Sequence, residues 1–171
     1  YADNYKRFSH SDCPFSSLKQ VKMTKNSLIS FGGQVRIRFE DDRNRGLAQT
    51  PVNQSLFVNR LFVFSDLRFG SNLRLFVEGK YAGLLNNDLP ASPIMRDRPD
   101  VQNLFVDFAA FSSKSSQLSV RLGRQEMQFG KQRLISPLDW ANIRRTFQGA
   151  RLSYSQPGLT VDVFATRPVL V

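Results

Sequence analysis

The sequence predicts an all-β protein, a transmembrane antiparallel up-and-down β-barrel, and three observations support this expectation. Apolar and polar residues alternate along successive segments, as they do in strands whose two faces meet different surroundings. The connections between these segments alternate between long and short. No uninterrupted apolar run approaches the roughly 18 residues that a membrane helix requires, which excludes a helical membrane protein but leaves a barrel open.

Residues 31–40 show the alternation most clearly. The apolar phase is Phe31, Gly33, Val35, Ile37 and Phe39, and the polar phase is Gln34, Arg36, Arg38 and Glu40. In a soluble lipocalin-like binding module the apolar face would point inward and the arginines would lie outside. In a membrane barrel the apolar face would meet lipid and the arginines would line the interior. The alternation by itself leaves both arrangements open.

The same period of two predicts seven strands. They are residues 27–40, 55–69, 72–83, 101–111, 117–125, 147–155 and 159–168. Several have about the 9 to 11 residues that span a bilayer with tilt.

The predicted connections separate into two classes by length. In chain order they are residues 41–54, 70–71, 84–100, 112–116, 126–146 and 156–158. Long loops on one rim and tight turns on the other are typical of bacterial outer-membrane barrels. A soluble up-and-down barrel has no reason to separate its loops in this way, so the alternation favours the membrane barrel.

Seven is an odd number of strands, whereas single-chain bacterial outer-membrane barrels have even numbers. An odd count would leave an unpaired edge inside the membrane. We therefore expect residues 27–171 to be the N-terminal part of a larger barrel, preceded by a periplasmic segment over residues 1–26. A strand over residues 18–23 would instead give a small eight-stranded barrel, although its short link to Ser27 would disturb the loop alternation.

The polar phase of the predicted strands carries eight cations against five anions. The cations are Arg36, Arg38, Arg60, Arg68, Arg74, Lys80, Arg121 and Arg151, and the anions are Glu40, Asp66, Glu78, Asp107 and Asp162. An eight-stranded barrel is filled by its own side chains, where each unpaired cation would cost several kcal/mol. A wide, water-filled lumen avoids that cost, so the excess favours a large pore.

Composition narrows the classes of partner and chemistry. With 24 Lys and Arg against 14 Asp and Glu, the formal net charge is +10, which should attract polyanions. The cations are spread over every strand and no nucleic-acid-binding motif occurs, which argues against nucleic acid. One cysteine, Cys13, and one histidine, His10, cannot form a Cys/His zinc cluster. We find no nucleophile–base pair and no convincing set of metal ligands, so we expect neither an enzyme nor a cofactor.

Residues 121–154 are the least strand-like part of the chain. Ser136 and Pro137 followed by Asp139 have the pattern of an N-cap, a first-turn proline and an acidic third position. The sequence therefore predicts a helix over residues 137–145, inside a helical loop at about 136–146. A packed loop of this kind would act as a lid or constriction, or Trp140 would simply anchor the loop to the rim.

The same segment carries residues at a characteristic spacing. They are Gly123, Arg124 and Gln125, then Gly130 and Arg133, then PLDW at 137–140 and RTFQGAR at 145–151. This set resembles the signature of the alginate export family of outer-membrane barrels. LKQVKM at 18–23 and FGGQVRIRFE at 31–40 are similar to the N-terminal strands of that family. Gln148 departs from the pattern, because we would expect an acidic residue there.

The resemblance implies a monomeric barrel, on the order of the 16 to 18 strands of porin-like channels, in the outer membrane of a Gram-negative bacterium. Its electropositive constriction would pass an anionic uronate polymer. The resemblance is also compatible with periplasmic export partners. By motif match, Arg124, Glu126, Arg133, Arg144 and Arg151 would lie near the lumen or its outer exit. The strand pattern adds Arg36, Arg38, Arg60, Arg74 and Arg121, with Asp107 as an interleaved acid that limits how tightly any one arginine binds.

Overall fold

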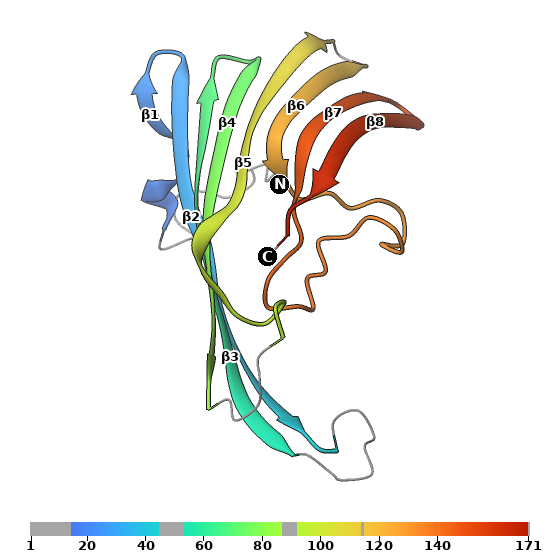
Figure 1. The fold of residues 1–171 in the computed structure, drawn as a ribbon. Helices are drawn as coiled ribbons and strands as arrows, with labels where there is room; N and C mark the ends of the chain where they lie inside the picture. The colour runs from blue at the N-terminus through green and yellow to red at the C-terminus, as the bar shows by residue number, and fades with distance from the viewer. Residues whose placement is uncertain (1–14, 45–52, 87–91, 114, 171) are drawn as a thin grey trace.

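The computed structural model describes residues 15–44, 53–86, 92–113 and 115–170. Within them, eight antiparallel strands form one sheet in chain order (Figure 1). The strands are β1 (Val21–Thr24), β2 (Ser27–Asp42), β3 (Gln54–Phe69), β4 (Leu73–Leu85), β5 (Asp97–Ser112), β6 (Gln117–Gln125), β7 (Phe147–Gln156) and β8 (Leu159–Pro168), and a 3-10 helix, Ser16–Leu18, precedes β1. Each strand pairs with its neighbours in sequence, so the predicted all-β, up-and-down class is confirmed.

The tight turns lie at one end of the sheet and the long connections at the other (Figure 1). The turns join β1 to β2, β3 to β4, β5 to β6 and β7 to β8. Gly70 and Gly158 have φ angles of 60° and 79° in two of these turns, a conformation that favours glycine. The structure therefore has the tight-turn rim and the long-loop rim that the sequence predicts.

The sheet begins at β1, inside the segment 1–26 that we expected to precede the barrel. Val21 pairs with Ile29 and Lys22 with Leu28. The possible strand over residues 18–23 is therefore present as the shorter strand β1. The turn that follows β1 lies on the tight-turn rim, and it therefore preserves the loop alternation instead of disturbing it. Four residues are too few to show a clear period of two, which is why the sequence pattern indicates this strand only weakly.

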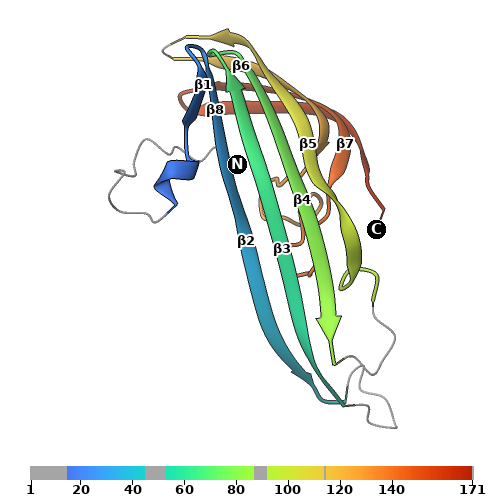
Figure 2. The same ribbon diagram turned by 90° about the vertical axis from the view of Figure 1, so that its left-hand side faces the viewer.

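The eight strands do not close into a small barrel. β1 and β8 are the two ends of the strand order, and they do not pair with each other in the part of the chain that the structure describes. Strands β2 to β4 run long and nearly straight, whereas β5 to β8 curl over to one side (Figure 2). A small membrane barrel would have to close so that no edge is open to lipid. The described strands form an open, curved sheet instead, so the eight-stranded alternative is wrong.

The polarity of the two faces of the sheet is the reverse of that in a soluble protein. On the convex face apolar side chains are exposed, Val35 and Ile37 at 72% each and Val63 at 56%. On the concave face charged side chains are buried, with Arg60 at 2% and Asp66 at 3% exposed. A lipocalin-like module would bury its apolar phase, so this pattern contradicts that alternative. The convex face is the lipid-facing surface of a membrane barrel.

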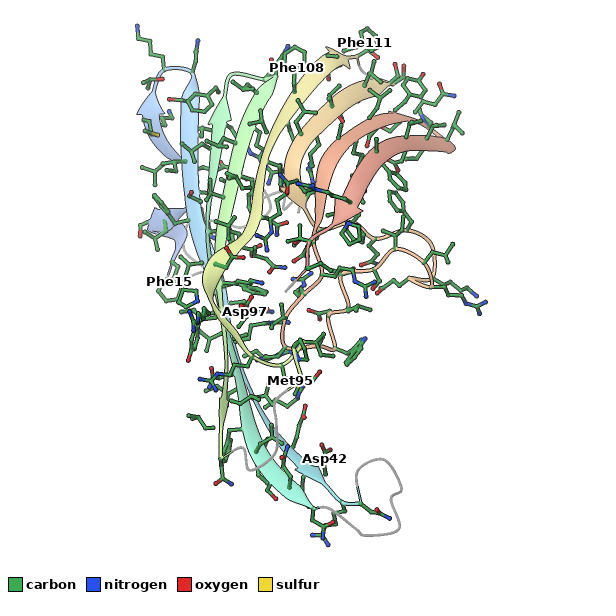
Figure 3. The ribbon with its side chains drawn as sticks, viewed as in Figure 1. Phe15, Asp42, Met95, Asp97, Phe108 and Phe111 are labelled. Carbon is green, nitrogen blue, oxygen red and sulfur yellow. The ribbon has the colours of Figure 1, made fainter. Side chains whose placement is uncertain are left out.

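Aromatic side chains mark the edge of this apolar face. Phe108 and Phe111 project from β5 close to the tight-turn rim (Figure 3) and are 49% and 52% exposed. Phe69 lies near the same rim and is 43% exposed. Aromatic girdles of this kind occur where barrels meet the membrane interface. No helix in the described residues is long and apolar enough to cross a membrane.

The helix predicted over residues 137–145 is wrong. Residues 126–146 consist of turns, bends and irregular chain. Leu138 has a φ angle of 54°, which interrupts a helix at its start. Ser136 Oγ accepts a hydrogen bond from Leu138 N, a local turn that competes with helix formation. Backbone carbonyls at 139–141 accept hydrogen bonds from arginines of the sheet instead.

Val63→Lys would place a charge near the middle of the convex face. We expect it to lower the free energy of unfolding in lipid by about 2–4 kcal/mol, because a lysine at the bilayer midplane loses its hydration. Ser119→Lys, on the concave face, is the matched control and should cost much less. Denaturant unfolding in vesicles, followed by heat-modifiable gel migration, measures both losses. Equal losses would contradict the assignment of the two faces.

Candidate functional site

The connection between β6 and β7, residues 126–146, lies on the concave side of the sheet (Figure 1). We call it the inner loop. Its residues Met127, Ala141 and Ile143 are buried, so part of the loop packs against the wall. Because it folds inward, the inner loop narrows the space enclosed by the concave face.

Arginines of the first long strand hold the inner loop by its backbone. Arg36 donates from Nη1 to Asp139 O and from Nη2 to Ala141 O, both at 2.8 Å. Arg38 donates from Nη1 to Trp140 O at 3.0 Å. A planar guanidinium presents several donors in a fixed fork, so two side chains can bind three successive carbonyls.

Arg60 on β3 also holds the inner loop, and we call Arg36, Arg38 and Arg60 together the anchor. It donates from Nη1 to Ala141 O at 3.3 Å, and from Nη2 to Gln34 Oε1 at 2.8 Å and Asp139 Oδ1 at 3.2 Å. Its guanidinium lies 4.8 Å from the centre of the Phe62 ring. A buried charge requires partners. The inner loop provides two partners for Arg60, Ala141 O and Asp139 Oδ1.

Asn142 joins the inner loop to two further segments. Its Nδ2 donates to Asn59 O and Met95 O, both at 2.9 Å. The backbone N of Ile143 donates to Ile94 O, also at 2.9 Å. Asn142 is fully buried, so its hydrogen bonds fix the loop to β3 and to the chain that precedes β5.

A polar cluster lies where the inner loop leaves β6. Glu126 pairs with Arg144 Nη2 at 2.6 Å and accepts from Gln102 Nε2 at 2.8 Å. Asn103 donates from Nδ2 to Glu78 at 2.6 Å and accepts at Oδ1 from the backbone N of Glu126. Burial raises the pKa of Glu126 above its usual value, and Arg144 opposes this shift. Among the described residues, no group of three or more His, Cys, Asp or Glu could hold a metal ion.

Alternating charges cross the concave face nearer the tight-turn rim. This belt consists of Asp66, Arg68, Arg74, Asp107, Arg121, Arg151 and Asp162. Arg121 binds Asp107 through hydrogen bonds of 2.5 and 2.8 Å. Arg74 bridges Asp66 at 2.7 Å and Asp107 at 3.3 Å. The strand register places Asp107 opposite both Arg74 and Arg121, so the belt follows from the pairing of the strands.

Aromatic rings lie beneath the belt. Phe76 and Phe105 are buried and stack with centroids 5.2 Å apart. The guanidinium of Arg121 lies 3.8 Å from the Phe105 centroid, and that of Arg74 lies 5.2 Å from the Phe76 centroid. Cation–π contact restricts a planar guanidinium and leaves the N–H groups at its edge for hydrogen bonding.

The belt borders a hollow of about 670 Å³ in the concave face. Four cations line it, and these are Arg68, Arg74, Arg121 and Arg151. Arg121 Nη1 and Arg151 Nη1 make no hydrogen bond with any residue that the structure describes. The hollow is therefore a polar space whose arginines retain donors for a ligand.

The charge excess counted on the predicted strands is smaller in the structure. Lys80 pairs with Asp97 at 2.6 Å and Arg60 with Asp139 at 3.2 Å. Asp97 and Asp139 lie outside the seven predicted strands, so the excess of cations over anions on those strands does not include them. Arg36 binds carbonyl groups and so needs no carboxylate. The excess of cations on the strands therefore no longer favours a wide pore, and the pore stays a prediction.

The residues expected along the substrate pathway fall into separate groups. Arg36, Arg38, Arg60, Glu126 and Arg144 contact the inner loop or belong to it, and Arg74, Asp107, Arg121 and Arg151 belong to the belt. Arg124 donates to Thr146 at 3.1 Å and to Asp100 at 3.0 Å. Arg133 is exposed and borders a hollow with Phe129 and Phe164. That these residues form a pathway stays a prediction.

Asp139 and Asn142 are site residues that sequence reasoning missed. The sequence indicates only a helix start at Asp139, whereas Asp139 pairs with Arg60 and Arg144. Asn142 lies in an irregular stretch without periodicity, and its partners lie up to 83 residues away. The PLDW run next to Asn142 was the one available signal, since it belongs to the motif spacing.

A sheet with an apolar outer face, an inward-folded loop and a belt of arginine and aspartate is the construction of a transport barrel. A family model for alginate export matches residues 27–171. The chain belongs to the alginate export family. This membership confirms the resemblance seen in the sequence and gives the protein an outer-membrane location and a general role in polysaccharide export. No curated protein and no solved structure matches the chain.

Arg60→Met would remove the buried guanidinium that this alginate export family member uses to hold its inner loop. We expect the loop to become more mobile, because Ala141 O and Asp139 each lose a donor. The chain has one tryptophan, Trp140, so a fall in its fluorescence anisotropy measures the change. Arg43→Met is the control, since Arg43 is largely exposed. Anisotropy that does not differ between the two variants would contradict the anchor.

Glu126 makes the stability of the folded protein depend on pH. A carboxyl with a raised pKa binds its proton more tightly in the folded state, so its contribution to stability is largest below the ordinary pKa of glutamate. That contribution is lost as the pH rises through the folded-state pKa. Glu126→Gln resembles the protonated form and should abolish this part of the pH dependence. Unfolding free energies of parent and variant at about pH 7 and about pH 4.5 test this, and a constant difference between the two proteins would refute it.

Proposed function

We propose that the protein is an outer-membrane channel that passes an alginate-like anionic polysaccharide, or smaller anionic solutes, along the belt and past the inner loop. The belt is the observation that carries the proposal, because four arginines line one hollow on the wetted side of the sheet. A polyuronate has one carboxylate per sugar. Guanidinium forks bind carboxylates through paired, charge-assisted hydrogen bonds.

The aspartates of the belt would keep this binding weak. Arg121 already engages Asp107 through Nε and Nη2. An incoming carboxylate would therefore bind the remaining Nη1 or exchange with Asp107, so that one ion pair replaces another. Binding that is weak and repeated at several sites allows the polymer to enter and also to leave.

The inner loop would set the width of the passage. The sequence left two roles for it, a lid or constriction, or a rim anchor through Trp140. The Trp140 ring is 63% exposed, and it is the carbonyl of this residue that Arg38 binds. A loop fixed by Arg36, Arg38 and Arg60 supports the role of a constriction.

Export would bring the polymer to the tight-turn rim first, because that rim faces the periplasm in bacterial barrels. The polymer would pass the belt and then the inner loop, where Glu126 and Arg144 lie. Arg124 and Arg133 would extend the pathway toward the outer exit. Periplasmic export partners would bind at the tight-turn rim of a monomeric barrel in a Gram-negative host.

Replacing Arg121 and Arg151 together with glutamine in the full-length protein should lower anion selectivity in planar bilayers. Two of the four cations of the hollow are lost, while Asp107 and Asp162 keep their charge. Current block by added polyuronate should weaken in parallel. Lys25→Gln with Arg43→Gln is the matched control, since it removes two exposed cations elsewhere. Unchanged selectivity in a variant that still shows heat-modifiable migration would sink the proposal.

A further inference from the structure

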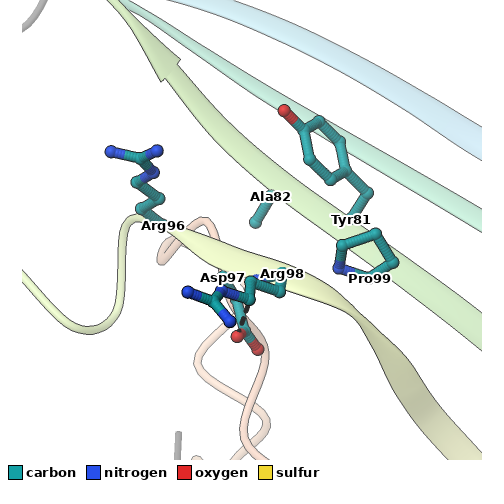
Figure 4. Close-up of a pocket in the computed structure, with 6 residues that line it drawn as sticks. All are labelled: Tyr81, Ala82, Arg96, Asp97, Arg98 and Pro99. Carbon is teal, nitrogen blue, oxygen red and sulfur yellow. Dashed lines mark hydrogen bonds between the residues drawn. The ribbon is translucent and has the colours of Figure 1, made fainter.

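A hollow outside the proposed pathway lies between the end of β4 and the start of β5 (Figure 4). Its volume is about 580 Å³, and its lining is Tyr81, Ala82, Arg96, Asp97, Arg98 and Pro99. The register of the two strands shifts here, because Lys80 pairs with Asp100 but Ala82 pairs with Asp97. The extra residue on β5 forms a bulge, and the hollow coincides with it.

Tyr81 and Arg98 belong to the lipid-facing side of this bulge. Tyr81 pairs with the exposed Leu61 of β3. Arg98 and Pro99 are the two β5 residues opposite Tyr81, between the pairs Lys80–Asp100 and Ala82–Asp97. Tyr81 is 45% exposed. A Cβ at position 83 would come within 2.9 Å of the Tyr81 hydroxyl oxygen. Gly83 therefore allows the tyrosine ring to lie along β4.

Among the residues that the structure describes, none neutralises the two arginines of the hollow. Arg96 and Arg98 are exposed, and in the close-up their side chains extend to the left, away from Tyr81 and Pro99 (Figure 4). Neither side chain forms an ion pair or hydrogen bond with a residue in the described ranges. The acid of the hollow, Asp97, is engaged by Lys80 at 2.6 Å and by the backbone N of Arg98 at 2.8 Å.

The hollow lies at the level where the outer leaflet ends. Tyr81 is eight residues beyond Leu73, the first residue of β4, which corresponds to about 26 Å along a strand and about 20 Å along the membrane normal at a tilt of about 40°. The lipid-facing band of a barrel is about 25 Å tall and ends in aromatic residues. The long-loop rim is the extracellular one, so Arg96 and Arg98 reach the headgroup level of the outer leaflet.

We propose that this hollow binds the phosphate of an outer-leaflet phosphorylated glycolipid. Arg96 and Arg98 hold the phosphate through charge-assisted hydrogen bonds. Tyr81 packs its ring against the lipid below, because an aromatic ring with a polar tip suits the membrane interface. The site is on the outside of the barrel and takes a lipid, whereas the belt faces the lumen and takes the transported anion, so either assignment can fail without the other.

Native mass spectrometry of the full-length protein in detergent, titrated with diphosphorylated lipid A, tests the proposal. Arg96→Gln with Arg98→Gln should weaken binding about tenfold or more, because two charge-assisted contacts to phosphate are lost. Lys25→Gln with Arg43→Gln removes the same charge elsewhere and should bind like the parent. Arg98→Lys keeps the charge without the planar fork and should show a smaller loss, which gives a second measurement if the double variant does not fold.

Two further arms distinguish the lipid from a free anion. Removing the phosphates from lipid A should weaken its binding to the parent protein. This loss should be at least as large as the loss that the double variant shows with the intact lipid. Inorganic phosphate at millimolar concentration should leave the bound lipid in place. Equal binding by parent and double variant, equal binding of the two lipids, or displacement by inorganic phosphate would each overturn the proposal.

Discussion

Lipid on one side of the sheet is the constraint on which the rest of this structure depends. Hydrocarbon offers no hydrogen bonds, so the backbone groups of each strand must pair within the sheet. The side chains on that face must be apolar, as Val35, Ile37 and Val63 are. Many charged residues consequently lie on the concave face, where Arg60, Asp66 and Glu78 are nearly fully buried.

Arginine satisfies this constraint in two ways that lysine could not. In the anchor, the forks of Arg36 and Arg60 bind backbone carbonyls and so fix a loop that has no regular structure. In the belt, Arg74 and Arg121 lie on phenylalanine rings. Arg74 bridges Asp66 and Asp107, and Arg121 pairs with Asp107. A planar group with five donors can stack and form several hydrogen bonds at once. The same residue type thus fixes the inner loop and forms the cationic part of the belt on the concave face.

The faces of the strands were predictable because a period of two is a local property. The phase of residues 31–40 already places Arg36 and Arg38 together on one face of the strand, and the structure shows that this face is the concave one. The inner loop was not predictable in the same way. Its local pattern at Ser136 to Asp139 favours a helix, but three guanidinium groups bind its carbonyls and Leu138 takes a positive φ. Contacts over about a hundred residues outweigh a weak local preference.

The sequence by itself determined the all-β class, the phase of each long strand, the two rims and the family, because alternation, turn residues and motif spacing are written in consecutive residues. Only the tertiary structure decided which charges meet. A count along the strands leaves Lys80 and Arg60 without partners, whereas folding brings Asp97 and Asp139 to them. The physical reason is that an ion pair depends on distance in space. Strand register and the course of the inner loop set that distance, and no local pattern encodes it.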